Sequence, residues 1–367
     1  MRRFLIALCV AALGIGLSAV SATAASAWSS RTIVVWPGQS IQAAINRAHP
    51  GDTVLVKPGV YHQSLLIRKD GITLRGSGDF WGGTVILPPK KIPNTICNNP
   101  NLFGPTGICI LAKNVNLSTG AVITPVRNDT VTNLLVANFP EGNGVFGYGT
   151  DRLTVTWVAA INNEYYGISR FDSTRTVFAN DIATGSGEAG FYVGDSPDAN
   201  TVVRNDQAYG NQFGIFVRHA RYVLVTGNRV SGNCQGILVL DDGQAGGAGN
   251  ATVVYNWASS NNKFCPANAD EHTPAFQGGG IALVGATWTL VAHNYVSGNR
   301  GNQVNSGCIV VLSAKPLTGG SNPNFDTIAR NTAFGNHPAD LRWDGTGTGV
   351  RFKQNDCATS IPAGLCH

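Results

Sequence analysis

Short stretches of alternating apolar and polar residues recur along the chain, and each begins with a glycine followed by an apolar residue. Residues 210–220, GNQFGIFVRHA, and residues 232–242, GNCQGILVLDD, share the frame G-N-x-x-G-I-x-V. Alternation over four or five positions is the period of a β-strand and not of a helix. The Gly-apolar start occurs at Gly144, Gly167, Gly190, Gly214, Gly236, Gly280 and Gly307. The first five copies are spaced 23, 23, 24 and 22 residues apart, which predicts a solenoid.

Each repeat is too short for a crossover helix but long enough for three short strands joined by turns. Stacked coils of this kind form a parallel β-helix, in which neighbouring coils pair about 4.8 Å apart and wind right-handedly. Pairs of asparagines five or six positions apart recur at Asn205/Asn211, Asn228/Asn233, Asn256/Asn261, Asn294/Asn299 and Asn331/Asn336. We interpret these asparagines as ladders along the stack and not as ligands.

Both ends of a coil stack need a cover for their apolar interior. Residues 40–49, SIQAAINRAH, predict a helix with Ser40 as its N-cap and with Ile41, Ala44 and Ile45 on one face. We expect residues 28–52 to be an N-terminal cap. The period breaks from about His337, so residues 337–367 are the expected C-terminal cap. The predicted fold class is therefore all-β, one right-handed parallel β-helix over residues 28–367 with a short N-terminal capping helix.

One long segment points to a known superfamily. The segment SIQAAINRAHPGDTVLVKPGVYHQSLLIRKDGITLRGSG, followed by TVI, resembles the opening of right-handed β-helix proteins of the pectin-lyase-like superfamily. The later G-I-x-V and N-x-V-x-x-N stretches look like the parallel β-helix repeat of many secreted members. The resemblance implies the fold, but the superfamily includes lyases, hydrolases, esterases, epimerases and members without known catalysis.

The first 27 residues have the character of a secretory signal peptide. They carry Arg2 and Arg3, an apolar run and a small-residue end, so we expect cleavage after Ala27 and a secreted, extracellular protein. No later stretch approaches the length of a membrane span, and we expect no membrane insertion.

Seven cysteines follow the predicted signal peptide. We expect disulfides because the compartment is oxidising. The pairs that sequence position suggests are Cys97–Cys109, Cys234–Cys265 and Cys357–Cys366. Cys308 takes an apolar place in the repeat frame and is the expected buried free thiol.

The chain is weakly charged, with a formal net charge of +5 and 13% charged residues. It has no Lys/Arg cluster of the kind that neutralises phosphates, so nucleic acid is not an expected partner. Nucleotide-binding, nucleophile-elbow and zinc motifs are also missing from the sequence.

Alternation assigns two faces to each repeat strand. The residue after each frame glycine, such as Ile215 or Ile237, should face the core. Arg170 falls at an inward position, so its strand is expected to bulge or to end early. The outward residues include five aromatics: Phe146, Tyr148, Phe171, Tyr192 and Phe216. They would either stack against sugar rings or pack beneath the long insertions, and both readings stay open.

The fifth residue after the frame glycine carries the candidate chemistry. Four successive repeats place Asp172, Asp195, His219 and Asp241 there, with Gly149 and Gly285 at the flanking repeats. Stacked in register, these side chains would lie roughly 5 Å apart, so the carboxylates would raise one another's pKa or gather a cation. The alternative is that each aspartate only bonds backbone N–H groups in its turn.

The resemblance adds a chemical expectation. Lyases and epimerases of the superfamily abstract the proton α to a uronate carboxylate with an Arg, Lys, His or Tyr base, while Ca²⁺, Arg or Lys neutralises the acid. Matching residue types here are Asp172, Asp195, His219, Asp241, Arg218 and Tyr192, with Arg221 as a second guanidinium. The stretch GDSPDAN lacks the histidine of the Asp-Pro-His motif of alginate epimerases, and the paired aspartates of polygalacturonases are missing.

Two insertions fall beside these repeats, at residues 241–250 and 261–280. Long loops on one face of a solenoid commonly build its binding site. The second insertion adds Glu271 and His272 as candidate substrate-binding residues.

We therefore expect a secreted protein that binds or processes an acidic polysaccharide, by lyase or C5-epimerase chemistry and with Ca²⁺ as a candidate cofactor. The alternative is a non-catalytic carbohydrate-binding or cell-envelope protein. A third reading, an accessory factor like the β-helix protein of nitrous oxide reductase maturation, is disfavoured because methionines and clustered thiols for copper are lacking.

Overall fold

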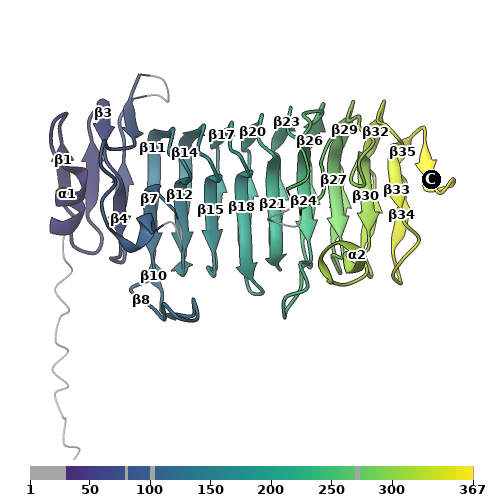
Figure 1. The fold of residues 1–367 in the computed structure, drawn as a ribbon, viewed down its shortest axis with the longest axis horizontal. Helices are drawn as coiled ribbons and strands as arrows, with labels where there is room; N and C mark the ends of the chain where they lie inside the picture. Colours follow the sequence, from purple (N-terminus) through teal and green to yellow (C-terminus); the bar gives the residue numbers. More distant parts are fainter. Residues whose placement is uncertain (1–29, 79–81, 100–103, 269–272, 367) are drawn as a thin grey trace, which may run out of the picture.

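The chain winds into a single row of stacked coils with its described ends at opposite ends of the row (Figure 1). The computed structural model describes residues 30–78, 82–99, 104–268 and 273–366. The predicted signal peptide lies outside the described residues. Within them, no helix has the length and apolar character that crossing a membrane requires.

One face of the stack is an eleven-stranded parallel sheet. Its strands, in order along the axis, are β4 (Leu65–Ile67), β7 (Thr106–Leu111), β12 (Asn143–Tyr148), β15 (Tyr166–Phe171), β18 (Ala189–Ser196), β21 (Phe213–Ala220), β24 (Gln235–Leu240), β27 (Gly279–Val284), β30 (Gly307–Leu312), β33 (Leu341–Trp343) and β36 (Ser360–Ile361).

Two further rows of parallel strands complete each coil. The first row holds β1 (Thr32–Val35), β2 (Thr53–Val56), β5 (Thr73–Arg75), β11 (Thr130–Ala137), β14 (Thr154–Ile161), β16 (Val177–Ala179), β19 (Thr201–Arg204), β22 (Val223–Thr226), β25 (Thr252–Val254), β28 (Leu290–Ala292), β31 (Thr327–Ala329) and β34 (Arg351–Lys353). The second row, into which β11 and β14 continue, holds β3 (Gly59–His62), β6 (Thr84–Leu87), β17 (Ile182–Thr184), β20 (Gln207–Tyr209), β23 (Arg229–Ser231), β26 (Trp257–Ser259), β29 (Tyr295–Ser297), β32 (Thr332–Phe334) and β35 (Asp356–Cys357).

A few short elements lie outside these rows. They are the antiparallel pair β8 (Asn114–Val115) and β9 (Val122–Thr124), the parallel pair β10 (Val126–Arg127) and β13 (Thr150–Asp151), a 3-10 turn at Ile96–Asn98, and the helices α1 (Ile41–Arg47) and α2 (Lys315–Thr318). The architecture is the predicted parallel β-helix.

The interior of the coils is apolar, as the alternation predicted. Ile215 pairs with Ile237 in register, and both side chains are fully buried in one continuous core. Arg170 corrects the prediction of a bulge or an early strand end, because it pairs in register with Val193 inside β15. Its guanidinium is buried and donates to the Thr201 hydroxyl at 2.9 Å, to the Gly194 carbonyl at 3.2 Å and to the Ser196 hydroxyl.

Two asparagine ladders run along the inner turns and confirm the structural interpretation. In the first, the Asn228 amide donates to Asn256 at 2.9 Å, and Asn256 donates to Asn294 at 3.0 Å. A second ladder, five residues further along each coil, has the same geometry. One member was assigned wrongly: Asp206, not Asn205, occupies the ladder position and accepts from the Asp181 backbone at 2.8 Å.

The two ends are closed differently from each other. Helix α1 begins after Ser40, whose hydroxyl accepts from the Ala43 backbone N–H, and its buried residues Ile41, Ala44 and Ile45 cover the first coil. At the other end the period does not break at His337, since β33, β34 and β35 add one more coil in register. The partly buried side chains that pack on the last core layer are Trp343, Val350, Phe352, Cys357, Leu365 and Cys366.

The cysteine prediction is confirmed. Disulfides join Cys97–Cys109, Cys234–Cys265 and Cys357–Cys366, and Cys308 is free and buried. The frame at Cys308 was one residue out of register, because Ile281 pairs with Ile309 and not with Cys308. Cys308 thus occupies the place of a frame glycine.

Candidate functional site

Asp172, Asp195, His219 and Asp241 lie in one file at the end of the eleven-stranded sheet. Phe171 pairs with Gly194, Gly194 with Arg218, and Arg218 with Leu240, so the next residue of each strand forms the next rung of the file. The φ angles of Asp172, Asp195 and His219 are 44°, 51° and 47°, and Gly149 and Gly285 at the flanking rungs also have positive φ. This turn needs a left-handed residue, which explains why Gly, Asp and His alternate there.

His219 is held between Asp195 and the insertion 241–250. Its Nε2 lies 2.8 Å from the Ala245 carbonyl oxygen, which can only accept, so Nε2 carries a proton. The buried Nδ1 has no hydrogen bond and faces Asp195 Oδ1 at 3.5 Å. Only 7% of the residue is exposed, so His219 packs beside Asp195 and does not itself reach into solvent.

Asp172 and Asp195 are the two members of the file that solvent reaches. The pKa of Asp172 is raised, because the surrounding atoms partly desolvate it and Asp195 repels its charge. The nearby Tyr148 hydroxyl and the charge of Arg170 oppose this rise. Asp195 accepts weakly from the Gln244 amide at 3.4 Å, so the same insertion orients it.

A second acidic group, Asp242, pairs with Arg218 next to the file. Arg218 Nε lies 2.9 Å from Asp242 Oδ2, and the Gln244 amide donates to the same oxygen at 2.6 Å. Burial raises the pKa of Asp242, but the hydrogen bonds from Gln244 and the charge of Arg218 outweigh it, and the pKa is lowered. Gln244 therefore links the Asp195 carboxylate to the Asp242–Arg218 pair.

Two predicted site residues, Asp241 and Arg221, hold surface loops in place and do not point to the solvent beside Asp172 and Asp195. The Asp241 carboxylate is buried and accepts from the backbone N–H groups of Gly243 at 3.0 Å and Ser321 at 2.8 Å. Arg221 donates to the Gly246 carbonyl, the Thr287 hydroxyl and the Asn250 side chain. Both residues line a separate hollow of about 370 Å³ between the loops.

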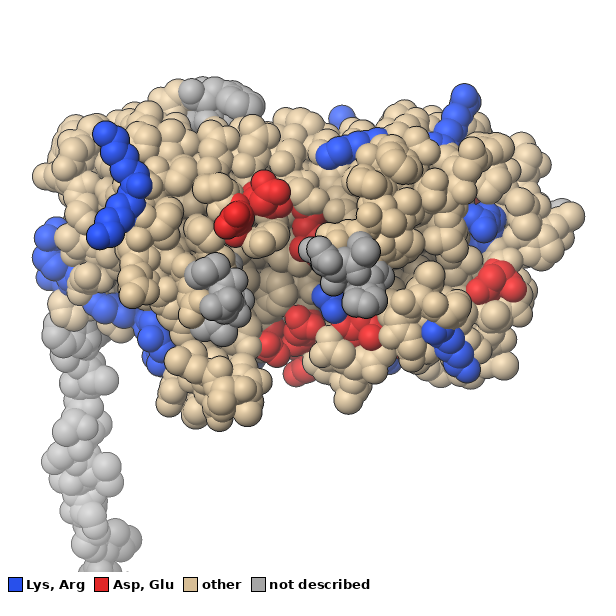
Figure 2. All heavy atoms as spheres, viewed as in Figure 1, with Lys and Arg blue, Asp and Glu red and all other residues tan. Residues whose placement is uncertain are grey.

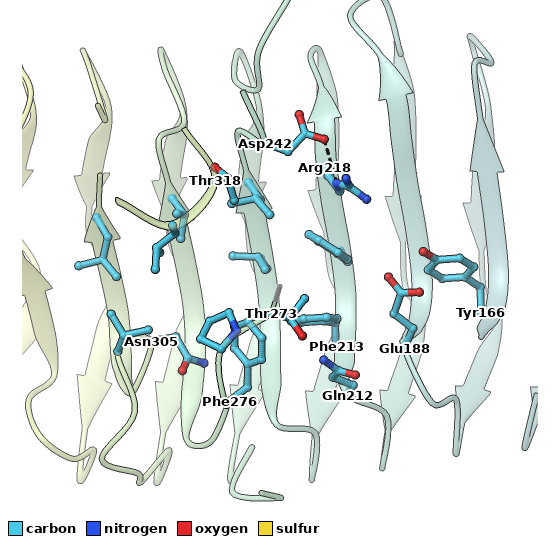
Figure 3. Close-up of a pocket in the computed structure, with 18 residues that line it drawn as sticks. Tyr166, Glu188, Gln212, Phe213, Arg218, Asp242, Thr273, Phe276, Asn305 and Thr318 are labelled. Carbon is cyan, nitrogen blue, oxygen red and sulfur yellow. Dashed lines mark hydrogen bonds and ion pairs between the residues drawn. The ribbon is translucent and has the colours of Figure 1, made fainter. Parts of the chain in front are cut away.

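A pocket of about 660 Å³ lies on the outer face of the eleven-stranded sheet, beside the file. Its floor and walls include Phe213, Phe216, Leu238, Leu240, Phe276, Val284, Leu312 and Leu317. Figure 3 shows Arg218 and Asp242 at one edge of this pocket, Gln212 and Asn305 at the opposite edge, and Glu188 and Tyr166 at its end. Acidic side chains gather around the middle of this face of the molecule (Figure 2).

The aromatic strip exists, and most of it packs beneath the insertions. Tyr192 lies 4.6 Å from Phe171 and 5.4 Å from Phe216 between ring centroids, and it is fully buried. Tyr148 packs beneath the loop closed by Cys97–Cys109 and is also buried. Among the described residues that line the pocket, Phe216 is the one predicted sugar-stacking residue. The insertion residue Phe276 packs edge-on against its neighbour Phe213 at 5.0 Å between ring centroids.

The file also bears on the expectation of a cation. Among the described residues, Asp195, His219 and Asp242 offer ligand atoms that all lie within 4.8 Å of one another. Ca²⁺ prefers six to eight oxygen ligands, whereas this set offers one imidazole and an Asp242 oxygen already engaged by Arg218 and Gln244. The ligand atoms of these three residues therefore do not fit Ca²⁺.

The sequence did not single out Glu188, Tyr166 and Gln244, which line or bridge the site. Gln244 lies in an insertion that the sequence associated with the site, but its side-chain direction depends on the folded loop. Tyr166 and Glu188 come just before the frame glycines Gly167 and Gly190, at positions where the repeats share no residue type. Glu271 and His272 lie outside the described residues.

The family described as right handed beta helix region matches residues 143–322. The A-module of mannuronan C-5 epimerase AlgE6 from Azotobacter vinelandii is 20% identical, with a TM-score of 0.55 over 87% of this chain and 86% of that chain. DFA-IIIase from Arthrobacter chlorophenolicus A6, solved without its lid, is 11% identical, with a TM-score of 0.57 over 88% and 94%. The periplasmic alginate epimerase AlgG is 12% identical, with a TM-score of 0.55 over 89% and 73%. At these identities the likeness concerns the fold. No curated protein sequence matches the chain significantly.

Proposed function

We propose that this right-handed parallel β-helix belongs to the pectin-lyase-like superfamily and is a secreted enzyme that cleaves glycosidic bonds in a polysaccharide. The observation that carries the proposal is the pair of solvent-reaching carboxylates on neighbouring coils, Asp172 and Asp195, with different electrostatic surroundings. The mannuronan and alginate epimerases that share this fold support a polysaccharide substrate. The three disulfides are consistent with export.

The charges around the pocket favour a neutral sugar at the reacting position. Asp242 and Glu188 line the pocket together with Arg218, which is already paired with Asp242 and also feels the charge of Asp195. A run of uronates would place further anions among these carboxylates without cations to match them. The apolar walls of the pocket suit the C–H faces of sugar rings, and its polar edges suit hydroxyl groups.

The two carboxylates divide the work of hydrolysis. Asp172, whose raised pKa favours the protonated form, donates its proton to the glycosidic oxygen as the bond to the anomeric carbon breaks. Neighbouring coils lie about 4.8 Å apart, so carboxyl groups on adjacent coils can approach the shorter separation of retaining glycosidases. Asp195 accordingly attacks the anomeric carbon, and the Asp172 carboxylate then takes a proton from the water that releases the sugar. The Gln244 amide holds Asp195 in position, and His219 packs beside it.

A second candidate is the uronate lyase or C5-epimerase chemistry expected from the sequence. Arg218 at the edge of the pocket favours it, since a guanidinium can neutralise a single uronate carboxylate. The buried Nδ1 of His219 disfavours it, because a base must reach the proton at C5.

The experiment is a panel of neutral and uronate polysaccharides, assayed for new reducing ends and for absorbance near 235 nm. We expect reducing ends with retained anomeric configuration and no unsaturated product. Asp195→Asn should lower kcat about a thousandfold, whereas Asp198→Asn, an exposed carboxylate outside the file, should leave it unchanged. Unsaturated product, or an unaffected Asp195→Asn variant, would refute the hydrolytic assignment.

A further inference from the structure

Strands β26, β29 and β32 belong to a different strand row from the sheet that carries the pocket (Figure 1). Exposed aromatic side chains gather on and beside these three strands. We call this surface the aromatic platform, made of Tyr255, Trp257, His293, Tyr295 and Phe334. Tyr255 stacks on His293 at 5.2 Å, Trp257 on Tyr295 at 4.2 Å, and Tyr295 meets Phe334 at 5.2 Å between ring centroids. Tyr255 is 64% exposed, Trp257 48% and Phe334 44%, so the described insertions do not cover it.

The backbone beneath the platform does not favour aromatic residues. Tyr255 and His293 occupy a corner at which each coil turns with positive φ, 58° and 55° for these two. The successive rungs of this corner are Asn133, Trp157, Asn180, Asn205, Gly227, Tyr255, His293, Arg330 and Gln354. Asn and Gly adopt this conformation with least strain, whereas a bulky side chain there costs free energy. Fold stability alone does not explain an exposed Tyr255 at such a position.

Arginines border the platform, and the acid of this strand row is Asp356, in the rung beyond Thr332. Arg229 pairs in register with Trp257, and Arg330 follows His293 at the corner. The described segments 227–239, 250–262, 287–300 and 327–337 contain three arginines and not one aspartate or glutamate. The surface is thus apolar in its middle and cationic at its rim.

We propose that the aromatic platform is a second binding site, which holds an anionic polysaccharide chain at a distance from the reaction centre. Sugar rings stack their C–H faces on Tyr255 and Trp257, while carboxylate or sulfate groups pair with Arg229 and Arg330. Stacked rungs about 4.8 Å apart give the platform the repeat of an extended polymer along the coil axis. The inference does not depend on catalysis, because it concerns another face of the molecule.

Charge complementarity selects this occupant. A single-stranded nucleic acid also stacks on aromatics, but it carries a phosphate at every unit and calls for a denser cationic track than three arginines. A second copy of this chain would bring the same cationic rim against itself.

The test replaces platform residues by those that the fold itself uses at equivalent rungs. Tyr255→Asn copies Asn205, and Trp257→Thr copies Thr332 of the same strand row. Affinity for polygalacturonate, measured by calorimetry, should fall about tenfold in this double variant and should decrease with salt in the wild type. The melting temperature and the turnover of a short oligosaccharide should not fall.

Controls separate the outcomes. Trp157→Asn changes another exposed aromatic at the same corner, four rungs away, and should leave the affinity unchanged. Asp195→Asn should bind polygalacturonate as the wild type does, so a failure of the proposed catalysis leaves this test intact. The proposal is overturned if the wild type binds polygalacturonate no better than dextran, or if the double variant binds polygalacturonate as well as the wild type. It is also overturned if the wild type binds poly(dT) more tightly than polygalacturonate. Light scattering that shows a wild-type dimer and a monomeric double variant would assign the platform to a second copy of the chain and would overturn the proposal too.

Discussion

Asp172, Asp195 and His219 owe their positions to a backbone conformation that most residues avoid. Each sits at a left-handed turn with φ between 44° and 51°, where glycine stands in the flanking coils. The turn directs Asp172 and Asp195 to solvent and seals His219 beneath Ala245. The same turn type therefore holds a solvent-reaching carboxylate in one coil and a buried imidazole in the next. The difference depends on whether a loop covers the turn.

Tyr148 tunes the proposed acid. Its hydroxyl donates to the Gly120 carbonyl at 2.5 Å and lies close enough to Asp172 to lower the pKa of that carboxyl, so Tyr148→Phe should raise the pKa of Asp172 further above its ordinary value. Because Asp172 must be protonated to act, the alkaline limb of the kcat/KM profile should move to higher pH, by roughly half a unit to one unit. A pH profile of the variant beside Tyr209→Phe, an exposed tyrosine elsewhere, makes the comparison. An alkaline limb that stays in place or moves to lower pH contradicts the assignment.

The ladder turns carry the clearest stability consequence of any repeated element. Asp206 occupies a rung where other coils carry asparagine, and it is buried with Oδ2 lacking a partner. Burial raises the pKa of Asp206 to about 8, although backbone hydrogen bonds oppose the rise. Asp181, the next rung, has a pKa raised in the same direction by burial and by Asp206. Burial thus favours the protonated form of both carboxyls, whereas asparagine would need no proton.

Asp206→Asn should therefore stabilise the protein at neutral and higher pH. The folded-state pKa lies above the unfolded one, so the stabilisation from the bound proton is complete below pH 4 and is lost as the pH rises to about 8. The variant should show a shallower decline of unfolding free energy over this window, with a gain of about 1–3 kcal/mol at pH 8. Urea unfolding at pH 4, 6 and 8 measures it. A variant less stable than the wild type at pH 8 would show that Asp206 is needed as an acid.

At the scale of the whole molecule, the features that could be predicted from the sequence are those that recur in each coil. A strand period repeated every 22 to 24 residues fixes which side chains become neighbours, so the coil stack, the ladders and the file of Asp172, Asp195 and His219 were all predicted. Features without a repeat were not. The burial of Tyr192 depends on insertions, and the role of Asp241 depends on Ser321, eighty positions later. The position of the Gln244 side chain could not be predicted either, because its loop lies outside the repeat.

The central claim is that carboxylates from two neighbouring coils, Asp172 and Asp195, act as one reaction centre. A double-mutant comparison of kcat on the polysaccharide that the wild type cleaves tests it most directly. If the two carboxylates act together, Asp172→Asn and Asp195→Asn each remove most of the activity. The kcat of the double variant should then lie within about tenfold of the kcat of the less active single variant. If the two losses multiply, or if either single variant keeps wild-type turnover, the residues do not form one centre.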